Sequence, residues 1–475
     1  MVFSSTLFLF LFLPITLAVY YFIKDRFQNY WLLAASFVFF GFSQPDYIWI
    51  IVLNIVVNYL AALAMSRWRL RRLTLLLCMA VNLGLLIYFK YFDFIIESVN
   101  LFFHMSVELR HIVLPIGISF FTFQGMSYSI DVYRGVVPVQ KNPFKVALYI
   151  VLFPQLIAGP IVRYAEVVTE IDRRSVDISD MACGIQRFII GLAKKAVVAN
   201  TMAVTADTIW GWGAGNSTPA VAWVGSIAYA LQIYYDFSGY SDMAIGLGRM
   251  FGFRFGENFR FPYISLSITE FWKRWHISLS SWFRDYVYIS LGGNRKRVYL
   301  NLIIVFLLTG VWHGASWNFI VWGIWHGAFI LIERALQRKR PAEKEETGKE
   351  GGKRPVFSSV LRWCYTLLVV NLGWVLFRAE TLGDALLYMK NLLGLAYRET
   401  GYTAASYLDG WTLTVMLVGI LFSTPLPKMG AAHVAERANG KAVLLVRYGM
   451  LLFLLGLSAM RVMAGTYNPF IYFQF

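Results

Sequence analysis

The chain has 475 residues, of which 58% are hydrophobic and only 15% are charged, and its mean hydropathy is +0.56. Soluble domains carry about 25% charged residues, so a chain this apolar could not cover itself with water-facing surface. The composition excludes a large soluble domain. It predicts an all-α polytopic membrane protein that forms a single membrane domain over residues 1–475.

The formal net charge is +16, from 43 lysines and arginines against 27 aspartates and glutamates. We attribute this excess to basic loops that face the cytosol and anionic lipid. Nucleic acid is not an expected partner, because no basic and aromatic surface or known nucleic-acid motif is present. The cysteines Cys78, Cys183 and Cys364 are far apart and form no CxxC pair, so neither a disulfide framework nor a thiolate metal site is expected.

A transmembrane helix needs about 20 mostly apolar residues. With weaker segments between the strong candidates, we expect about 11 spanning helices plus re-entrant and interfacial helices. A polar stretch at about 338–355 predicts a flexible cytosolic linker. The strong candidates are 5–23, 29–43, 47–65, 73–91, 112–130, 145–163, 219–236, 316–336, 357–377, 409–425 and 443–461.

Two segments carry polar residues beside apolar ones. Residues 181–198 have one apolar side and include Lys194 and Lys195, a pattern typical of an interfacial or short membrane-edge helix. In 234–248 (YYDFSGYSDMAIGLG), Asp236 and Asp242 directly follow an apolar helix. Two interpretations stay open for this segment: the carboxylates cap helix ends in a tightly packed region, or polar groups here line a substrate cavity.

The segment 268–286 alternates tryptophans with basic residues around His276, a mixture that also suits a simple anchor at the membrane interface. In 310–318 (GVWHGASWN), the preceding apolar run is too short to span, so the chain should break near the middle of the membrane. Non-helical backbone at that depth is tolerated only inside protein or beside a water-filled cavity. His313 is therefore the strongest functional candidate, and a structural histidine bonded to a carbonyl is its alternative.

His326 lies 13 positions after His313, which is about 140° away on a continuous helix. We expect His326 to pack or to form hydrogen bonds between helices. Metal binding is not expected, because His276 and His313 show no HxxxH or HExxH spacing. General base chemistry needs less, namely one neutral imidazole near a hydroxyl.

Several longer runs of the sequence are recognisable together. They are LPIGISFFTFQGMSYSIDVYRG at 114–135, FPQLIAGPIVR at 153–163, YDFSGYSDMAIGLG at 235–248, FPYISLSITEFWKRWHISLSSWFRDYVYISLGGNR at 261–295 and WHGASWNFIVWGIWHG at 312–327. The chain resembles the membrane-bound O-acyltransferase (MBOAT) family, and within it the bacterial alginate O-acetyltransferase (AlgI-like) branch. The related D-alanyl transfer proteins share the RWH and WHG elements, but the runs ending LGGNR and SDMAIGLG favour the acetylating branch.

The resemblance implies a fold in which helices surround a central tunnel, with His313 as the catalytic histidine and His276 as the second histidine of the bacterial branch. It implies acetyl-CoA as the donor substrate, with no tightly bound cofactor, in the plasma (inner) membrane. It also implies a partner of the SGNH-hydrolase type that places the acetyl group on an exopolysaccharide such as alginate. Candidate tunnel or substrate-lining residues are Asp236, Ser238, Tyr240, Trp312 and Asn318, and candidate CoA-side basic residues are Lys194, Lys195, Arg295, Lys296 and Arg297.

The expected mechanism is direct acyl transfer, in which His313 removes the hydroxyl proton and His276 orients or polarises the thioester carbonyl. Peptidoglycan O-acetylation and D-alanyl transfer to teichoic acid are the alternatives that keep this chemistry. A secondary transporter is the alternative of a different class. Transporters more often show repeated halves, whereas the polar groups here concentrate in one third of the chain.

Overall fold

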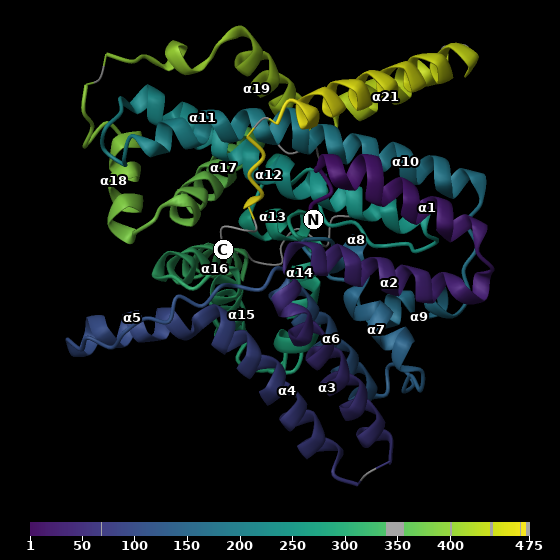
Figure 1. The fold of residues 1–475 in the computed structure, drawn as a ribbon. Coiled ribbons are helices and arrows are strands. Elements are labelled where there is room, and N and C mark those ends of the chain that lie inside the picture. The colour runs from purple at the N-terminus through teal and green to yellow at the C-terminus, as the bar shows by residue number, and fades with distance from the viewer. Residues whose placement is uncertain (68, 339–355, 400, 438–439, 466, 472–475) are drawn as a thin grey trace, which may run out of the picture.

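The computed structural model describes residues 1–67, 69–338, 356–399, 401–437, 440–465 and 467–471, and every regular element among them is helical (Figure 1). The linker expected at about 338–355 lies, apart from Arg338 at the end of a helix, outside the described residues. The helical elements of the first part are η1 (Phe8–Phe12), α1 (Leu13–Phe22), α2 (Asp25–Ser43), η2 (Pro45–Tyr47), α3 (Ile48–Arg67), α4 (Arg71–Leu86), η3 (Ile87–Tyr91), α5 (Phe92–Phe103), α6 (Ile118–Arg134), α7 (Pro143–Val151), α8 (Phe153–Leu156) and α9 (Tyr164–Asp172).

The middle of the chain holds the long helices α10 to α12 and the elements that carry the conspicuous histidines. These elements are α10 (Ile178–Ala193), η4 (Lys194–Ala199), α11 (Asn200–Gly211), α12 (Pro219–Met250), η5 (Pro262–Ile264), α13 (Ile268–Arg274), α14 (Ile277–Trp282), η6 (Phe283–Tyr288), α15 (Val298–His313) and α16 (Trp317–Arg338). The last part consists of α17 (Val356–Arg378), α18 (Leu382–Leu392), η7 (Ala404–Tyr407), α19 (Gly410–Phe422), α20 (Leu426–Arg437) and α21 (Gly440–Met463).

Six helices within the described residues are long and apolar enough to cross a membrane, or up to seven if α19 and α20, bent by 73°, form one span. The chain is thus a polytopic helical membrane protein, as predicted. The expected number of about 11 spans stays a prediction, since helices such as α15 are apolar but shorter. The six candidates are Pro45–Arg67, Arg71–Phe103, Ile178–Gly211, Trp317–Gln337, Val356–Arg378 and Gly440–Met463.

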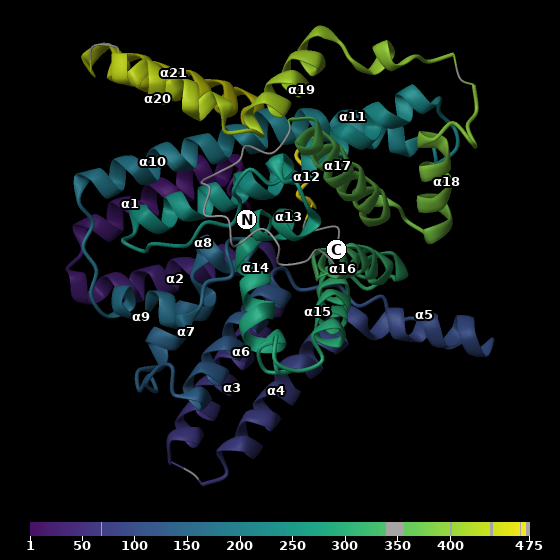
Figure 2. The same cartoon turned by 180° about the vertical axis from the view of Figure 1, so that it is seen from behind.

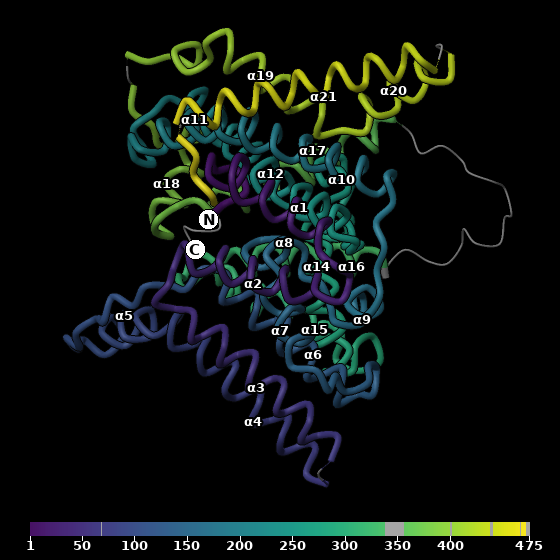
Figure 3. The backbone as a smooth tube through the Cα atoms, turned by 45° about the vertical axis from the view of Figure 1, so that its right-hand side comes forward, coloured from purple at the N-terminus to yellow at the C-terminus, as the bar shows by residue number. Residues whose placement is uncertain are grey.

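The helices α10 and α11 follow each other in one line across the upper half of the molecule, with α12 beside them, while α3 and α4 form a hairpin that projects from the lower half (Figures 1 and 2). The helix α21 lies along the outer edge, as the tube in Figure 3 shows. The elements α13 to α16 lie between α12 and the α3–α4 hairpin, so the segments with the conspicuous polar residues occupy the centre of the protein.

The structure corrects three sequence-based expectations. Residues 181–198 form no short separate helix, because α10 continues through η4 and α11 as a largely buried helix over Ile178–Gly211. The stretch 145–163 is no continuous span, since α7 ends at Val151 before a proline-containing segment. Asp236 and Asp242 cap no helix end, because α12 continues past both to Met250.

Glycines bring the backbones of α10 and α12 together, which explains why α12 can hold its polar residues against a neighbour. A Cβ added to Gly191 would lie 2.6 Å from the Gly239 carbonyl oxygen, and one added to Gly184 would lie 2.7 Å from that of Gly246. Small residues permit such close approach in membrane proteins, where packing and hydrogen bonds drive helix association. Each helix contributes two glycines seven residues apart, Gly184 and Gly191 on α10 and Gly239 and Gly246 on α12. These four glycines define the antiparallel contact.

Candidate active site

The helix α15 ends at His313, and the chain turns through Gly314 before α16 begins at Trp317. The break that the short apolar run predicts is confirmed. The α15 and α16 backbones cross closely, because a Cβ on Gly310 would overlap the Phe319 carbonyl oxygen. This tight crossing fixes the last turn of α15, which carries His313.

The His313 side chain is 7% exposed, and its Nε2 atom has no hydrogen-bond partner among the described residues. Its ring packs against Trp312, Trp322 and Phe377, with ring centroids 4.9, 4.9 and 5.2 Å away. Most buried polar groups are paired, so a free imidazole nitrogen needs an explanation. An aromatic enclosure that leaves this nitrogen available suits a group that acts on a bound ligand.

A cavity of about 360 Å³ lies beside His313. Trp312, Lys90 and the loop that leads into α6 line it. In particular, Gly117 adopts a left-handed conformation there (φ 75°) as the N-cap of α6. His313 thus borders a cavity large enough for part of a small ligand, rather than packing against lipid.

His276 also lies in the interior, with 0% exposure, at the turn between α13 and α14. Its φ of 45° is unusual for a residue other than glycine. The Asn258 amide oxygen accepts from the backbone N–H of Ser278 (3.2 Å), which fixes the orientation of this amide. His276 Nδ1 lies 3.2 Å from the same oxygen, so Nδ1 carries the proton and a neutral His276 presents a bare Nε2.

Trp312 contacts both histidines, with ring centroids 5.9 Å from His276 and 4.9 Å from His313. The structure therefore brings together the two histidines expected at the site, which come from different elements. His326 is separate, on α16, where it packs against Trp272 and Trp322 with centroids 5.3 and 5.1 Å away. Neither His326 nor His276 is among the residues that line the cavity beside His313, and His276 is connected to it through Trp312.

Other expected site residues lie in ion pairs, one of them buried and one partly exposed. Lys195 Nζ is 2.7 Å from Asp236 Oδ1, with side chains 3% and 1% exposed, and the backbone N–H of Ile471 donates to the other Asp236 oxygen at 2.8 Å. Lys194 likewise pairs with Asp242 at 2.7 Å, and Arg187 contacts the same carboxylate. These charges hold α12 to the helix that precedes it and to the C-terminal segment, rather than forming an open basic surface.

The remaining candidates are scattered. Ser238 and Tyr240 are buried on α12, and their hydroxyls have no hydrogen-bond partner within the described residues. The Tyr240 ring stacks on Phe3 with centroids 4.4 Å apart. Asn318 donates to the Ala379 carbonyl, which ties α16 to the end of α17. Arg295, like the two basic residues after it, is exposed in the turn before α15.

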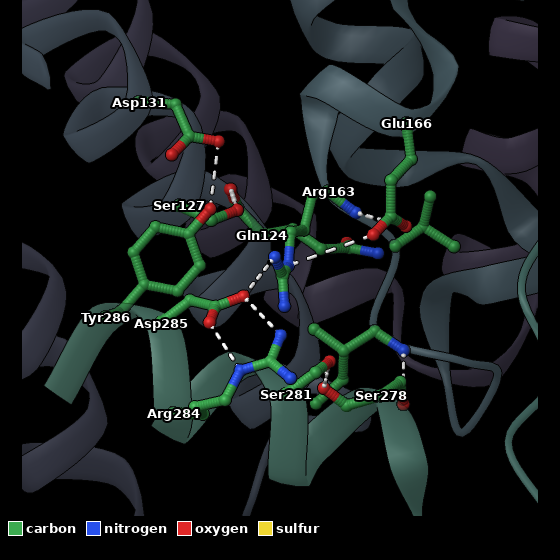
Figure 4. Close-up of polar contacts among 12 residues, drawn as sticks. Gln124, Ser127, Asp131, Arg163, Glu166, Ser278, Ser281, Arg284, Asp285 and Tyr286 are labelled. Carbon is green, nitrogen blue, oxygen red and sulfur yellow. Dashed lines mark hydrogen bonds and ion pairs between the residues drawn. The ribbon is translucent and has the colours of Figure 1, made fainter. Parts of the chain in front are cut away.

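A polar cluster between α6, α9 and η6 joins residues from three segments that the sequence analysis considered separately (Figure 4). Arg163 pairs with Asp285 at 2.6 Å, and Arg284 lies at the same distance from that carboxylate. Burial alone would raise the pKa of Asp285, but the bond from Arg284 and the charge of Arg163 lower it below its usual value. Nearby, the Tyr286 hydroxyl donates to Asp131 at 2.8 Å. Three consecutive residues of η6, Arg284 to Tyr286, thus connect this element to α6 and to the start of α9.

Lys90 is a second residue that sequence reasoning missed. Its ammonium group donates to the carbonyl oxygens of Trp312 and His313 at 2.7 and 3.0 Å. The signal that could have found it is a single charge within an otherwise uncharged stretch, 73–92. In the part of the chain that the structure describes, no group of three or more His, Cys, Asp or Glu side chains could hold a metal ion.

Comparisons with known proteins show which family of enzymes the chain is similar to. A profile of the membrane-bound O-acyltransferase family (MBOAT) matches residues 137–369. Over the full length of both chains, the protein is 41% identical to the probable alginate O-acetylase AlgI of Pseudomonas putida. It is 35% identical to the peptidoglycan O-acetyltransferase of Helicobacter pylori, over 90% of this chain and 87% of that protein.

The likeness to a teichoic acid D-alanyltransferase is weaker and shorter. The protein from Bacillus subtilis is 30% identical over 45% of this chain and 57% of its own length. Acyl transfer to oxygen is thus common to the family, and the full-length similarity lies with the acetylating proteins. Because the identity extends over the whole of both chains and not over one motif, this protein belongs to the MBOAT family of membrane-bound O-acyltransferases, in the AlgI-like branch of alginate O-acetylases.

Proposed function

We propose that this O-acyltransferase passes an acetyl group from cytosolic acetyl-CoA across the plasma (inner) membrane for O-acetylation of an extracellular polysaccharide such as alginate. The observation that carries the proposal is the position of His313, which ends a broken helix beside a 360 Å³ cavity with its Nε2 unpaired. The alginate O-acetylase relatives, about 41% identical over their full length, support the acetyl group and this polymer.

In the proposed reaction, His313 takes the proton of the acceptor hydroxyl while the hydroxyl oxygen attacks the acyl carbon. The carbon–sulfur bond of the thioester then breaks, and the proton passes from His313 to the departing thiolate. Positioned proton transfer of this kind contributes about 10²–10⁴-fold to rate. The aromatic rings around His313 limit water at the reacting carbon, which protects the thioester from hydrolysis.

His276 orients the thioester in this scheme. Because Asn258 accepts from Nδ1, a neutral His276 can only accept a hydrogen bond at Nε2, and the imidazolium form is needed to donate to a carbonyl oxygen. Transfer is direct, without an acyl-cysteine, since Cys78, Cys183 and Cys364 are not among the residues that line the cavity.

The donor and the acceptor hydroxyl approach from opposite sides of the membrane. Exposed Arg295, Lys296 and Arg297 before α15 can contact the phosphates of CoA, whereas Lys194 and Lys195 are already paired with carboxylates. CoA is a substrate here, and no tightly bound cofactor is needed. A partner of the SGNH-hydrolase type receives the acetyl group outside and places it on the polymer.

Peptidoglycan is the second candidate acceptor, because the Helicobacter pylori peptidoglycan O-acetyltransferase is 35% identical over most of both chains. The test uses the purified full-length protein in lipid nanodiscs, [¹⁴C]acetyl-CoA and a purified partner of the SGNH-hydrolase type. Label that reaches alginate, and not muropeptides, supports the proposal. Label on muropeptides supports the second candidate, and the absence of acetyl transfer from acetyl-CoA to either contradicts both.

A further inference from the structure

Lys90 lies in an unusual position for a charged side chain. It sits in η3, a π-helical turn within the candidate membrane span Arg71–Phe103, and no other charged residue occurs in 73–92. A charge within a membrane span is costly and normally has a function. Single π-helical turns within α-helices are frequent at functional sites. Lys90 also lies outside 137–369, the part of the chain that the family profile matches.

The contacts of Lys90 converge on the end of α15. Its ammonium nitrogen donates to the carbonyl oxygens of Trp312 (2.7 Å) and His313 (3.0 Å). The neighbouring Tyr91 hydroxyl donates to the Val311 carbonyl at 2.6 Å. Three consecutive carbonyls at the end of one helix are thus bound by two consecutive side chains of another.

Those carbonyls need partners from outside the helix. The last carbonyls of an α-helix have no intrahelical N–H donor, and they form the negative end of the helix dipole. A cation at a helix C-terminus satisfies both requirements. Beyond His313 the chain leaves the helix at Gly314, which is extended (φ −167°), so no further helical turn continues α15. Lys90 therefore acts on the residue whose side chain borders the cavity.

We propose that Lys90 is a positioning residue of the transferase site: its ammonium group caps α15 and holds the His313 imidazole against the cavity. This inference rests on the proposed role of His313 as the base. Lys90 lines the same cavity, and two of its three N–H groups are used by the carbonyls. Lys90, in the first third of the chain, thereby supports a site whose histidines, His276 and His313, come from later segments.

The first test measures turnover. We expect Lys90→Met to lower kcat about 10²-fold, since a displacement of about 1 Å at a reacting group has this effect, with the KM for acetyl-CoA unchanged. Lys90→Arg retains a cation and recovers most of the rate. Tyr91→Phe removes a neutral donor from the same helix end and gives a smaller loss. The matched control is Lys390→Met on α18, where the lysine is exposed and the variant should behave as wild type.

The second test does not depend on activity. Diethyl pyrocarbonate modifies imidazole nitrogens, and peptide mass spectrometry reports each histidine of the full-length protein separately. With the α15 cap removed by Lys90→Met, His313 becomes modified faster, while His326 on α16 keeps its wild-type rate. Lys90→Gln, a neutral hydrogen-bond donor, replaces Lys90→Met if the latter no longer elutes as folded protein.

Unchanged His313 modification together with wild-type kcat in Lys90→Met would overturn the inference. So would a folded Lys90→Arg variant that turns over as slowly as Lys90→Met. Failure of the proposed function looks different. In that case wild-type protein transfers no acetyl group from acetyl-CoA, while the change in His313 modification still reports whether Lys90 positions the ring.

Discussion

The Asn258 amide oxygen lies 3.2 Å from His276 Nδ1, and this one contact sets which nitrogen of the ring carries a proton. The amide cannot be turned round without loss, because its oxygen also accepts from the Ser278 backbone N–H and its nitrogen donates to Ser241 Oγ at 2.9 Å. His276 therefore offers its Nε2 toward the interior, and that atom has no protein partner in the described structure.

Replacing Asn258 by leucine should free the His276 ring from the contact that orients it. The leucine has similar volume but no acceptor for Nδ1, so we expect kcat for acetyl transfer to fall about 10- to 100-fold, as for other residues that orient a functional histidine. Asn258→Asp keeps an acceptor oxygen and should retain most of the rate. Steady-state transfer from labelled acetyl-CoA measures both. Wild-type kcat in folded Asn258→Leu would show that the contact between Asn258 and His276 is irrelevant to turnover.

His313→Gln is the direct test of the proposed base. Glutamine preserves a polar, similarly sized side chain but cannot take the hydroxyl proton, so kcat should fall about 10²–10⁴-fold. His433→Gln is the matched control, since His433 is exposed on α20. Acetyl transfer is measured on protein that elutes as a single species from size-exclusion chromatography. A His313→Gln variant with full activity would remove His313 from the mechanism.

The crossing of α15 and α16 should tolerate no added methyl group. Gly310→Ala places a Cβ against the Phe319 carbonyl, and overpacking of this kind costs about 1–3 kcal/mol. We expect a lower Tm in detergent and reduced activity, because His313 lies three residues further along the same helix. Gly456→Ala on α21 is the control, because nothing lies within 4 Å of its added Cβ. Equal Tm values for both variants would contradict the close crossing.

The ion pair of Lys195 and Asp236 should contribute more than a surface pair. Removing one partner leaves a buried charge unpaired, which costs about 3–5 kcal/mol. Lys195→Met should therefore lower Tm strongly, and the double variant Lys195→Met/Asp236→Leu should recover much of the loss. Asp172→Asn breaks the more exposed pair with Lys145 and should cost no more than about 1 kcal/mol. A double variant as unstable as Lys195→Met would argue against charge pairing as the cause.

The local sequence was sufficient to predict the break after His313, but it was not sufficient to predict the length of α12. The apolar run before His313 is too short to span, and this is visible within a few residues. In the sequence, by contrast, Asp236 and Asp242 look like unpaired charges that would end an apolar helix. Their partners lie on another part of the chain, namely Lys195, Lys194 and Arg187. Once paired, the carboxylates no longer oppose a helix that continues to Met250.

The contacts of the supporting residues could not be predicted from local sequence for the same reason. Lys90 acts on His313 across 223 positions, and Asn258 acts on His276 across 18. Both histidines could be recognised from motifs, since each lies among aromatic residues in a recognisable run. The groups that orient the rings depend on which helices meet in space, and periodicity within one segment does not encode that.

The four glycines of α10 and α12 have a practical consequence for anyone handling this protein. Lipid supplies no hydrophobic force between helices, so a contact built on close backbones keeps its strength when detergent replaces the bilayer. The helix α21, by contrast, has only 11% of its apolar window buried within the protein. During solubilisation, the outer helix should therefore detach first, while the central pair and the carboxylates it shelters survive as the last intact piece of the enzyme.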